Sequence, residues 1–199
     1  MHITLDYGTT GLEIDVPEDT TVITPAHQPR LPDVGTALRA ALRNPIGTPP
    51  LHQLAKRGMH VAIAICDITR AQPRRPMLEA IFRELSEIRT EDVVILVATG
   101  THRSNDADEL EAMLGPEIVE TYRVVNHVAR DTRGLARLDD TSTGVPVALN
   151  REWVEADLRI TTGFVEPHFF AGFSGGPKLV APGLAGLDTV MVLHDLSLI

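Results

Sequence analysis

The last fifth of this 199-residue sequence brings several chemically active residue types together. The segment from Glu166 to Lys178 holds His168, a glycine-rich loop and a terminal lysine, and His194 follows sixteen residues later. Glycines let main-chain amides approach a ligand closely, since no Cβ stands in the way. A lysine can form a covalent link or act as a point charge, and an imidazole can bind a metal or carry a proton. The segment therefore predicts a cofactor site.

The glycine-rich loop is not a Walker A phosphate loop. Such a loop ends in Gly-Lys-Ser/Thr, because the lysine contacts the phosphates and the hydroxyl binds Mg²⁺. Here Pro177 separates Gly176 from Lys178, and Leu179 occupies the hydroxyl position. Taken alone, the loop is equally consistent with an ordinary Gly/Pro turn that carries a solvated lysine.

Polar residues also follow three predicted strands. Val61–Cys66 and Val93–Ala98 are apolar runs typical of parallel strands buried on both faces. A third strand is predicted at residues 158–162. Because parallel sheets bind ligands beyond the carboxyl ends of their strands, we expect the polar residues there to converge on one active site. They are Asp67, Thr69, Arg70, His102, Arg103 and His168.

Each of these polar residues also has a structural explanation. Asp67 can cap a turn, and Arg70 can pair with one of the 27 acidic residues. His102 can be structural or solvated, as isolated histidines often are. Taken one at a time, the residues leave both explanations open.

The pattern along the whole chain predicts an α/β fold: a Rossmann-like, mostly parallel sheet with flanking helices and an N-terminal β-hairpin. The hairpin is expected within residues 3–16. Further strands are predicted at residues 123–128 and 145–149. Helices are predicted at residues 34–43, 51–57 with Gly58 as C-cap, 76–88, 106–114 and 190–198.

The composition predicts one globular domain and excludes several functional classes. A net charge of -9 argues against nonspecific binding to nucleic acid or to an anionic membrane, since both need basic surfaces. Cys66 is the single cysteine, so an intrachain disulfide is excluded. The sequence contains no membrane-spanning apolar run and no visible secretion signal. A cytoplasmic enzyme or binding protein fits best.

Four ordered elements resemble the N-terminal domain of the nickel-pincer lactate racemase family, whose members racemise or epimerise 2-hydroxy acids. These elements are Asp67-Ile-Thr-Arg70, Ala98-Thr-Gly-Thr-His102-Arg103, the segment Glu166 to Lys178, and His194. Each is weak evidence alone, but their shared order and similar spacing extend over almost the whole chain.

The resemblance implies a nickel pincer nucleotide as cofactor. It is a pyridinium mononucleotide whose two thiocarboxyl arms bind nickel, and it is expected to be attached covalently as a thioamide at Lys178. The resemblance makes His194 the expected fourth ligand, and square-planar Ni(II) accepts an imidazole in that position. The other expected site residues are Asp67, Ile68, Thr69 and Arg70 for nucleotide binding, and His102 and His168 for acid–base catalysis.

The implied reaction removes hydride from the substrate, which avoids a carbanion next to the carboxylate. One histidine takes the hydroxyl proton, a planar 2-keto acid forms, and hydride returns to the opposite face. Imidazoles suit both roles because their unperturbed pKa is about 6.5. The implied partners are a 2-hydroxy acid and the proteins that synthesise the cofactor.

The sequence departs from the family pattern in two places. A proline commonly follows the arginine of the first motif, whereas Ala71 and Gln72 stand here before Pro73. Relatives also continue well beyond the position of Ile199, so we expect residues 1–199 to be a single domain that lacks a C-terminal substrate-binding domain. The alternatives are a nucleotide-binding or regulatory module without turnover, and a zinc hydrolase that uses His102, His168 and His194.

Overall fold

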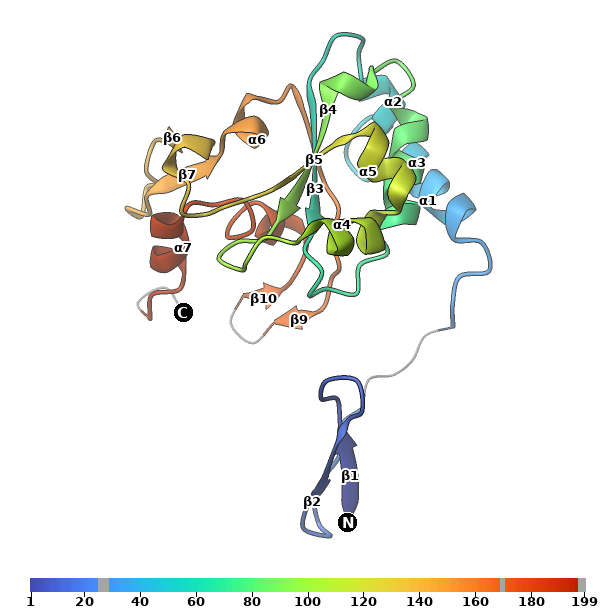
Figure 1. Cartoon of the computed structure of the whole chain (residues 1–199), viewed down its shortest axis with the longest axis vertical. Coiled ribbons are helices and arrows are strands. Elements are labelled where there is room, and N and C mark those ends of the chain that lie inside the picture. Colours follow the sequence, from blue (N-terminus) through green and yellow to red (C-terminus); the bar gives the residue numbers. More distant parts are fainter. Residues whose placement is uncertain (25–28, 169–170, 197–199) are drawn as a thin grey trace. The chain divides into compact units, whose positions relative to one another are not determined.

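The computed structural model describes residues 1–24, 29–168 and 171–196. The chain divides into two compact units, Met1–Pro32 and Asp33–Ile199. In the first unit, strands β1 (His2–Leu5) and β2 (Leu12–Asp15) pair in antiparallel fashion (Figure 1). This pairing confirms the predicted N-terminal hairpin.

The second unit is built on a four-stranded parallel sheet. Its strands are β3 (Val61–Cys66), β4 (Val93–Ala98), β5 (Arg123–Asn126) and β8 (Leu158–Thr161), in the order β5-β4-β3-β8. Figure 1 labels β3, β4 and β5 in the middle of this unit. Both apolar runs form buried strands, as predicted, and they are the two central strands of the sheet. All six residues of β3 are buried, because neighbours and helices cover the strand on both faces.

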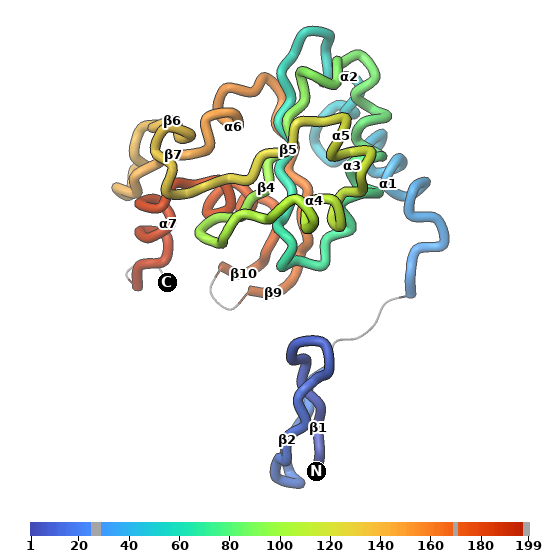
Figure 2. The backbone as a smooth tube through the Cα atoms, viewed as in Figure 1, coloured from blue at the N-terminus to red at the C-terminus, as the bar shows by residue number. Residues whose placement is uncertain are grey.

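Side chains alternate between the two faces of this sheet. Ile63 and Ile95 face a core formed with the helices α3 (Arg74–Glu84) and α4 (Ala107–Leu114), whereas Ala64 and Leu96 face Trp153 on α6 (Arg151–Glu155). Helices α1 to α5 cover the first face (Figure 2). Helices α6 and α7 and the strands β6 (Leu135–Leu138) and β7 (Val147–Asn150) lie on the other face (Figure 2). The helices are α1 (Val34–Arg43), α2 (Leu51–Leu54), α3 (Arg74–Glu84), α4 (Ala107–Leu114), α5 (Pro116–Thr121), α6 (Arg151–Glu155) and α7 (Leu187–Leu193).

The predicted strand at residues 145–149 lies outside the parallel sheet. It is β7 (Val147–Asn150), which pairs in antiparallel fashion with β6 (Leu135–Leu138). The hydroxyl of Thr189 on α7 accepts a hydrogen bond of 3.0 Å from the Ala148 amide, which ties α7 to this pair. The remaining short elements are β9 (Pro167–His168), β10 (Gly172–Phe173) and the 3-10 helices η1 (Thr90–Asp92), η2 (Thr132–Gly134) and η3 (Gly176–Leu179).

Three predicted helix boundaries are wrong. Helix α2 ends at Leu54 because Ala55 is extended, and Gly58, expected as its C-cap, lies in a separate turn with φ +85°. Helix α3 starts two residues before the predicted range and ends at Glu84. Helix α7 ends at Leu193, earlier than the predicted residue 198, and residues 197–199 lie outside the described part of the chain. No helix in the described ranges is long and apolar enough to cross a membrane.

Candidate active site

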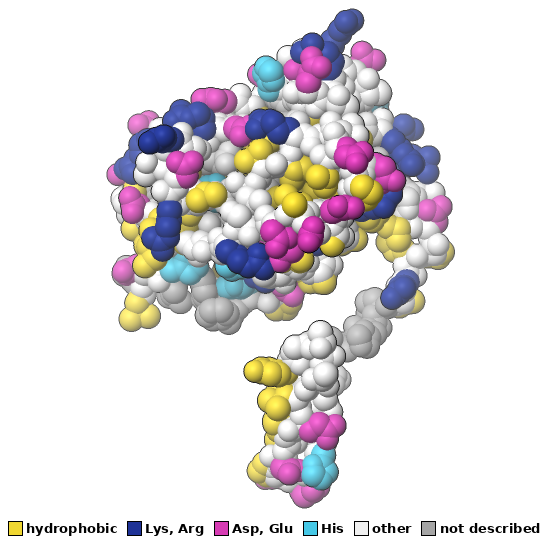
Figure 3. All heavy atoms as spheres, viewed as in Figure 1, with side chains coloured by type: hydrophobic (Ala, Val, Ile, Leu, Met, Phe, Trp, Pro, Cys, Tyr) yellow, Lys and Arg dark blue, Asp and Glu magenta, His cyan; other side chains and the backbone are white. Residues whose placement is uncertain are grey.

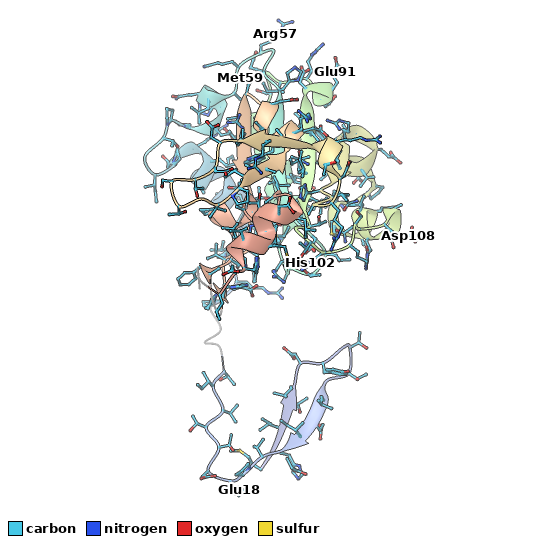
Figure 4. The ribbon with its side chains drawn as sticks, turned by 90° about the vertical axis from the view of Figure 1, so that its left-hand side faces the viewer. Glu18, Arg57, Met59, Glu91, His102 and Asp108 are labelled. Atoms are coloured by element: carbon cyan, nitrogen blue, oxygen red, sulfur yellow. The ribbon has the colours of Figure 1, made fainter. Side chains whose placement is uncertain are left out.

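A cleft of about 370 Å³ lies at the carboxyl ends of the central strands. Figure 4 shows His102, which follows β4, at the opposite end of the second unit from Met59 and Glu91, which precede β3 and β4. On the face shown in Figure 3, histidine side chains gather next to lysine and arginine side chains near α7 and β10. The cleft is lined by six of the predicted site residues: Asp67, Arg70, His102, His168, Lys178 and His194.

Asp67 and His102 form a hydrogen-bonded pair between the ends of β3 and β4. Nδ1 of His102 lies 2.6 Å from Oδ2 of Asp67, and the Asp67 side chain is only 6% exposed. The other oxygen of Asp67 accepts from the Thr69 hydroxyl at 2.6 Å and from the Thr69 amide at 3.2 Å. Because a carboxylate accepts, the neutral His102 ring carries its hydrogen on Nδ1 and its lone pair on Nε2. Such a ring can accept a proton at Nε2.

His168 is held in the opposite way on β9. The amide of Ala171 donates to Nδ1 of His168 at 3.2 Å, so the neutral ring carries its hydrogen on Nε2. Burial lowers the pKa of His168, and the positive charges of Lys178 and Arg70 lower it further. A ring in this form can donate a hydrogen bond from Nε2, and it becomes a proton donor when it is protonated to the imidazolium.

Lys178 reaches the cleft from η3, after the glycine-rich loop. Gly175 has φ +74°, a conformation that side chains rarely adopt, and a Cβ there would lie 3.3 Å from the Phe164 carbonyl oxygen. Burial lowers the pKa of Lys178, and Arg70 adds to this effect while Glu166 opposes it. The lowered pKa favours the neutral amine, which is the nucleophilic form of a lysine.

His194 follows α7 directly and lines the same cleft. Its Nδ1 lies 2.7 Å from the carbonyl oxygen of Val190. A carbonyl can only accept, so Nδ1 carries the hydrogen and Nε2 of the neutral ring carries the lone pair. A main-chain carbonyl that orients a ring in this way is typical of histidines that bind metals through the other nitrogen.

Three predicted residues do not line the cleft. Ile68 and Thr69 lie beside it, and Thr69 acts on Asp67 instead. The guanidinium of Arg103 donates to both carboxylate oxygens of Glu109, at 2.6 and 2.7 Å, and this pairing holds the pKa of Glu109 at about 2. The side chain of Arg103 therefore binds the first turn of α4.

Sequence reasoning missed the side chains that shape the loops around the cleft. The Ser174 hydroxyl donates to the Phe164 carbonyl at 2.6 Å and accepts from the Glu166 amide at 2.9 Å, which joins both sides of the β9–β10 hairpin. Gln72 and Arg74 support the loop after β3. No residue pattern marks such side chains, because most of their partners are main-chain groups, which have the same donors and acceptors in nearly every residue.

The fold and the cleft together define a Rossmann-like α/β domain with a cleft at the strand ends. The chain belongs to the lactate racemase N-terminal domain family, which it matches over residues 7–199. It is 37% identical over 158 residues to a lactate racemase from Thermoanaerobacterium thermosaccharolyticum and 38% identical over 156 residues to one from Lactiplantibacillus plantarum.

Solved structures show the same likeness. The lactate racemase apoprotein from T. thermosaccharolyticum superposes with a TM-score of 0.80 at 32% identity, over 98% of this chain and 46% of that one. A Thermotoga maritima protein gives a TM-score of 0.61 at 25% identity, over 81% of this chain and 40% of that one. The matches to the two curated relatives cover 79% and 78% of this chain, but only 37% of either relative.

Proposed function

We propose that this chain is the cofactor-binding and catalytic part of a 2-hydroxy-acid racemase or epimerase that uses a nickel pincer nucleotide attached to Lys178. Membership of the lactate racemase N-terminal domain family supports the reaction class. The observation that carries the proposal is the convergence of Lys178, His194, His102 and His168 on one cleft.

The residues of the cleft fit this cofactor. The volume of about 370 Å³ lies in the range of small-molecule sites, and Phe164, Leu179 and Val190 provide an apolar wall. The lowered pKa of Lys178 favours the amine that forms a thioamide, and Nε2 of His194 has the lone pair that a nickel ligand needs. When bound, the nickel pincer nucleotide supplies the hydride acceptor.

His102 and His168 are the proposed acid–base pair. For one enantiomer, neutral His102 would accept the substrate hydroxyl proton at Nε2, and His168, protonated to the imidazolium, would donate its Nε2 proton to the substrate oxygen when the alcohol re-forms on the opposite face of the planar 2-keto acid. In the reverse reaction the two residues exchange roles, since an imidazole side chain can act as an acid or as a base. The Asp67 carboxylate at Nδ1 of His102 supports its role as the base, because this partner places the lone pair of the neutral ring on Nε2.

The zinc hydrolase alternative has less support. Within the described ranges, no three His, Cys, Asp or Glu side chains are grouped so that they could hold a metal ion. A structural or catalytic zinc site needs at least three protein ligands. The proposed nickel site needs only His194 from this chain, because the cofactor provides the other donors.

The test is to produce the chain in a host with and without the cofactor-synthesis proteins, and to measure intact mass and nickel content. We expect a mass increase and bound nickel only with co-expression. Equal masses and no nickel in both samples would contradict the proposal and favour a module without turnover.

A further inference from the structure

Arg74, the first residue of α3, is buried although it carries a charge. Every hydrogen bond recorded for its guanidinium within the described part of the chain goes to a main-chain carbonyl. Nε donates to Cys66 at 2.9 Å and Nη1 to Gln72 at 3.3 Å. Nη2 donates to Arg70 at 2.7 Å and also to Asp67. These four carbonyls belong to the loop that leads from β3 into the cleft.

Gln72 holds the same loop from its other side. Its side-chain oxygen accepts from the Cys66 amide at 2.8 Å, and its side-chain nitrogen donates to the Thr162 hydroxyl at 2.8 Å. That hydroxyl donates in turn to the carbonyl of Ala64 at 2.9 Å. The amide and the carbonyl of Cys66 are therefore both bound by side chains that follow the loop, and the end of β3 is fixed against β8.

Burying an arginine at this position is unfavourable in free energy, so the contacts of Arg74 must offset that cost. Burial of a cation is unfavourable unless its donors are satisfied, and the first turn of a helix repels positive charge. Burial lowers the pKa of Arg74, and the charge of nearby Asp67 counteracts this. A guanidinium offers five donors in a rigid planar fork, so it can hold several carbonyls in one arrangement, which a neutral or flexible side chain cannot.

We propose that Arg74 is a positioning residue that shapes the loop of residues 67–70 so that the Asp67 carboxylate meets Nδ1 of His102. Arg74 thereby fixes the tautomer of the catalytic histidine without touching the substrate. This inference rests on the proposed acid–base role of His102, but the contact itself can be measured without turnover.

The experiment uses ¹⁵N-labelled chain and long-range ¹⁵N–¹H spectra, which distinguish the two histidine tautomers. In the unmodified chain we expect His102 to carry its hydrogen on Nδ1, with slow exchange of that hydrogen. Arg74→Met should mix the tautomers and speed the exchange by at least about tenfold, as expected for loss of one charge-assisted hydrogen bond. The control is Arg75→Met, because the exposed Arg75 pairs only with Glu79 and Glu117 among the described residues.

A second variant covers the case in which Arg74→Met does not fold. Arg74→Lys keeps the charge, but the lysine cannot reach all four carbonyls. The exchange rate of the His102 Nδ1 hydrogen should therefore lie between those in the unmodified chain and in Arg74→Met. An unchanged His102 tautomer and exchange rate in folded Arg74→Lys, or in folded Arg74→Met, would overturn the inference and leave Arg74 a stabilising residue only. Failure of the chain to bind nickel or gain mass would instead count against the proposed function.

Discussion

The Nδ1 atoms of His102 and His194 both carry a hydrogen in the neutral ring, but they donate it to different partners. Asp67 accepts from His102, and the Val190 carbonyl accepts from His194. A carboxylate partner suits a ring that moves protons, since it orients the ring and stabilises the imidazolium formed in catalysis. A carbonyl partner leaves a neutral ring with a fixed lone pair, which suits a metal ligand.

This difference predicts separate effects of mutation on nickel binding. After co-expression with the cofactor-synthesis proteins, His194→Ala should retain much less nickel than the unmodified chain, because a metal ligand is lost. His102→Ala and His168→Ala should retain nickel, and the matching substitutions in a full-length lactate racemase relative should abolish racemisation. Metal analysis of the three purified variants checks the division. Loss of nickel from His102→Ala, together with retention by His194→Ala, would show that the roles are assigned the wrong way round.

The charges around His168 predict how its protonation responds to mutation. Burial and the neighbouring cations lower its pKa, so its ring should stay neutral until the pH falls below the ordinary value of about 6.5. Arg70→Gln removes a cation that disfavours the imidazolium and should raise the pKa of His168. Glu166→Gln removes a favourable anion and should lower it further. NMR titration of the His168 ring measures both shifts, and shifts of the same sign would contradict this electrostatic explanation.

At the scale of elements, the sequence was most informative where burial is continuous. The runs that form β3 and β4 are apolar on both faces, and polar residues follow them directly, so both the strands and the convergence of their ends were predictable. Strand β6 was not, because its half-exposed sequence Leu135–Leu138 contains an arginine and depends on pairing with β7. The contacts of Arg74 with the loop after β3 were also not predictable from the sequence, since its partners are main-chain carbonyls.

The segment between η3 and α7 predicts a stability effect. A Cβ at Gly183 would overlap the carbonyl oxygen of Leu179 and lie 3.0 Å from Cβ of Ala98. Gly183→Ala should therefore lower the free energy of unfolding by about 1–3 kcal/mol, as overpacking does. Urea unfolding followed by fluorescence of the buried Trp153 measures this loss. Gly35→Ala in α1 is the matched control, because the nearest atom there is 3.5 Å away and alanine favours a helix. Equal stability of both variants would contradict the predicted clash.

For the molecule as a whole, the share of the relatives that this chain covers decides which activities we expect of residues 1–199 alone. The chain covers 37% of the length of either curated relative. We expect it to fold and to hold the cofactor, because the parallel sheet has a buried core on each face. We expect no appreciable racemisation, because the part of the relatives that this chain does not cover is expected to help position the substrate. A misplacement of the substrate by about 1 Å can lower the rate roughly a hundredfold. Chiral chromatography of lactate and malate incubated with loaded chain checks this, and turnover equal to that of a full-length relative would contradict it.

The central claim is that the cleft holds a cofactor bonded to Lys178, and peptide mapping of co-expressed protein tests it most directly. The unmodified chain should carry the added mass on the peptide that contains Lys178. Lys178→Arg should keep the charge and the fold but show no added mass, because a guanidinium cannot replace the amine in a thioamide. The same added mass in Lys178→Arg as in the unmodified chain would contradict the proposal. So would an added mass on a peptide that does not contain Lys178.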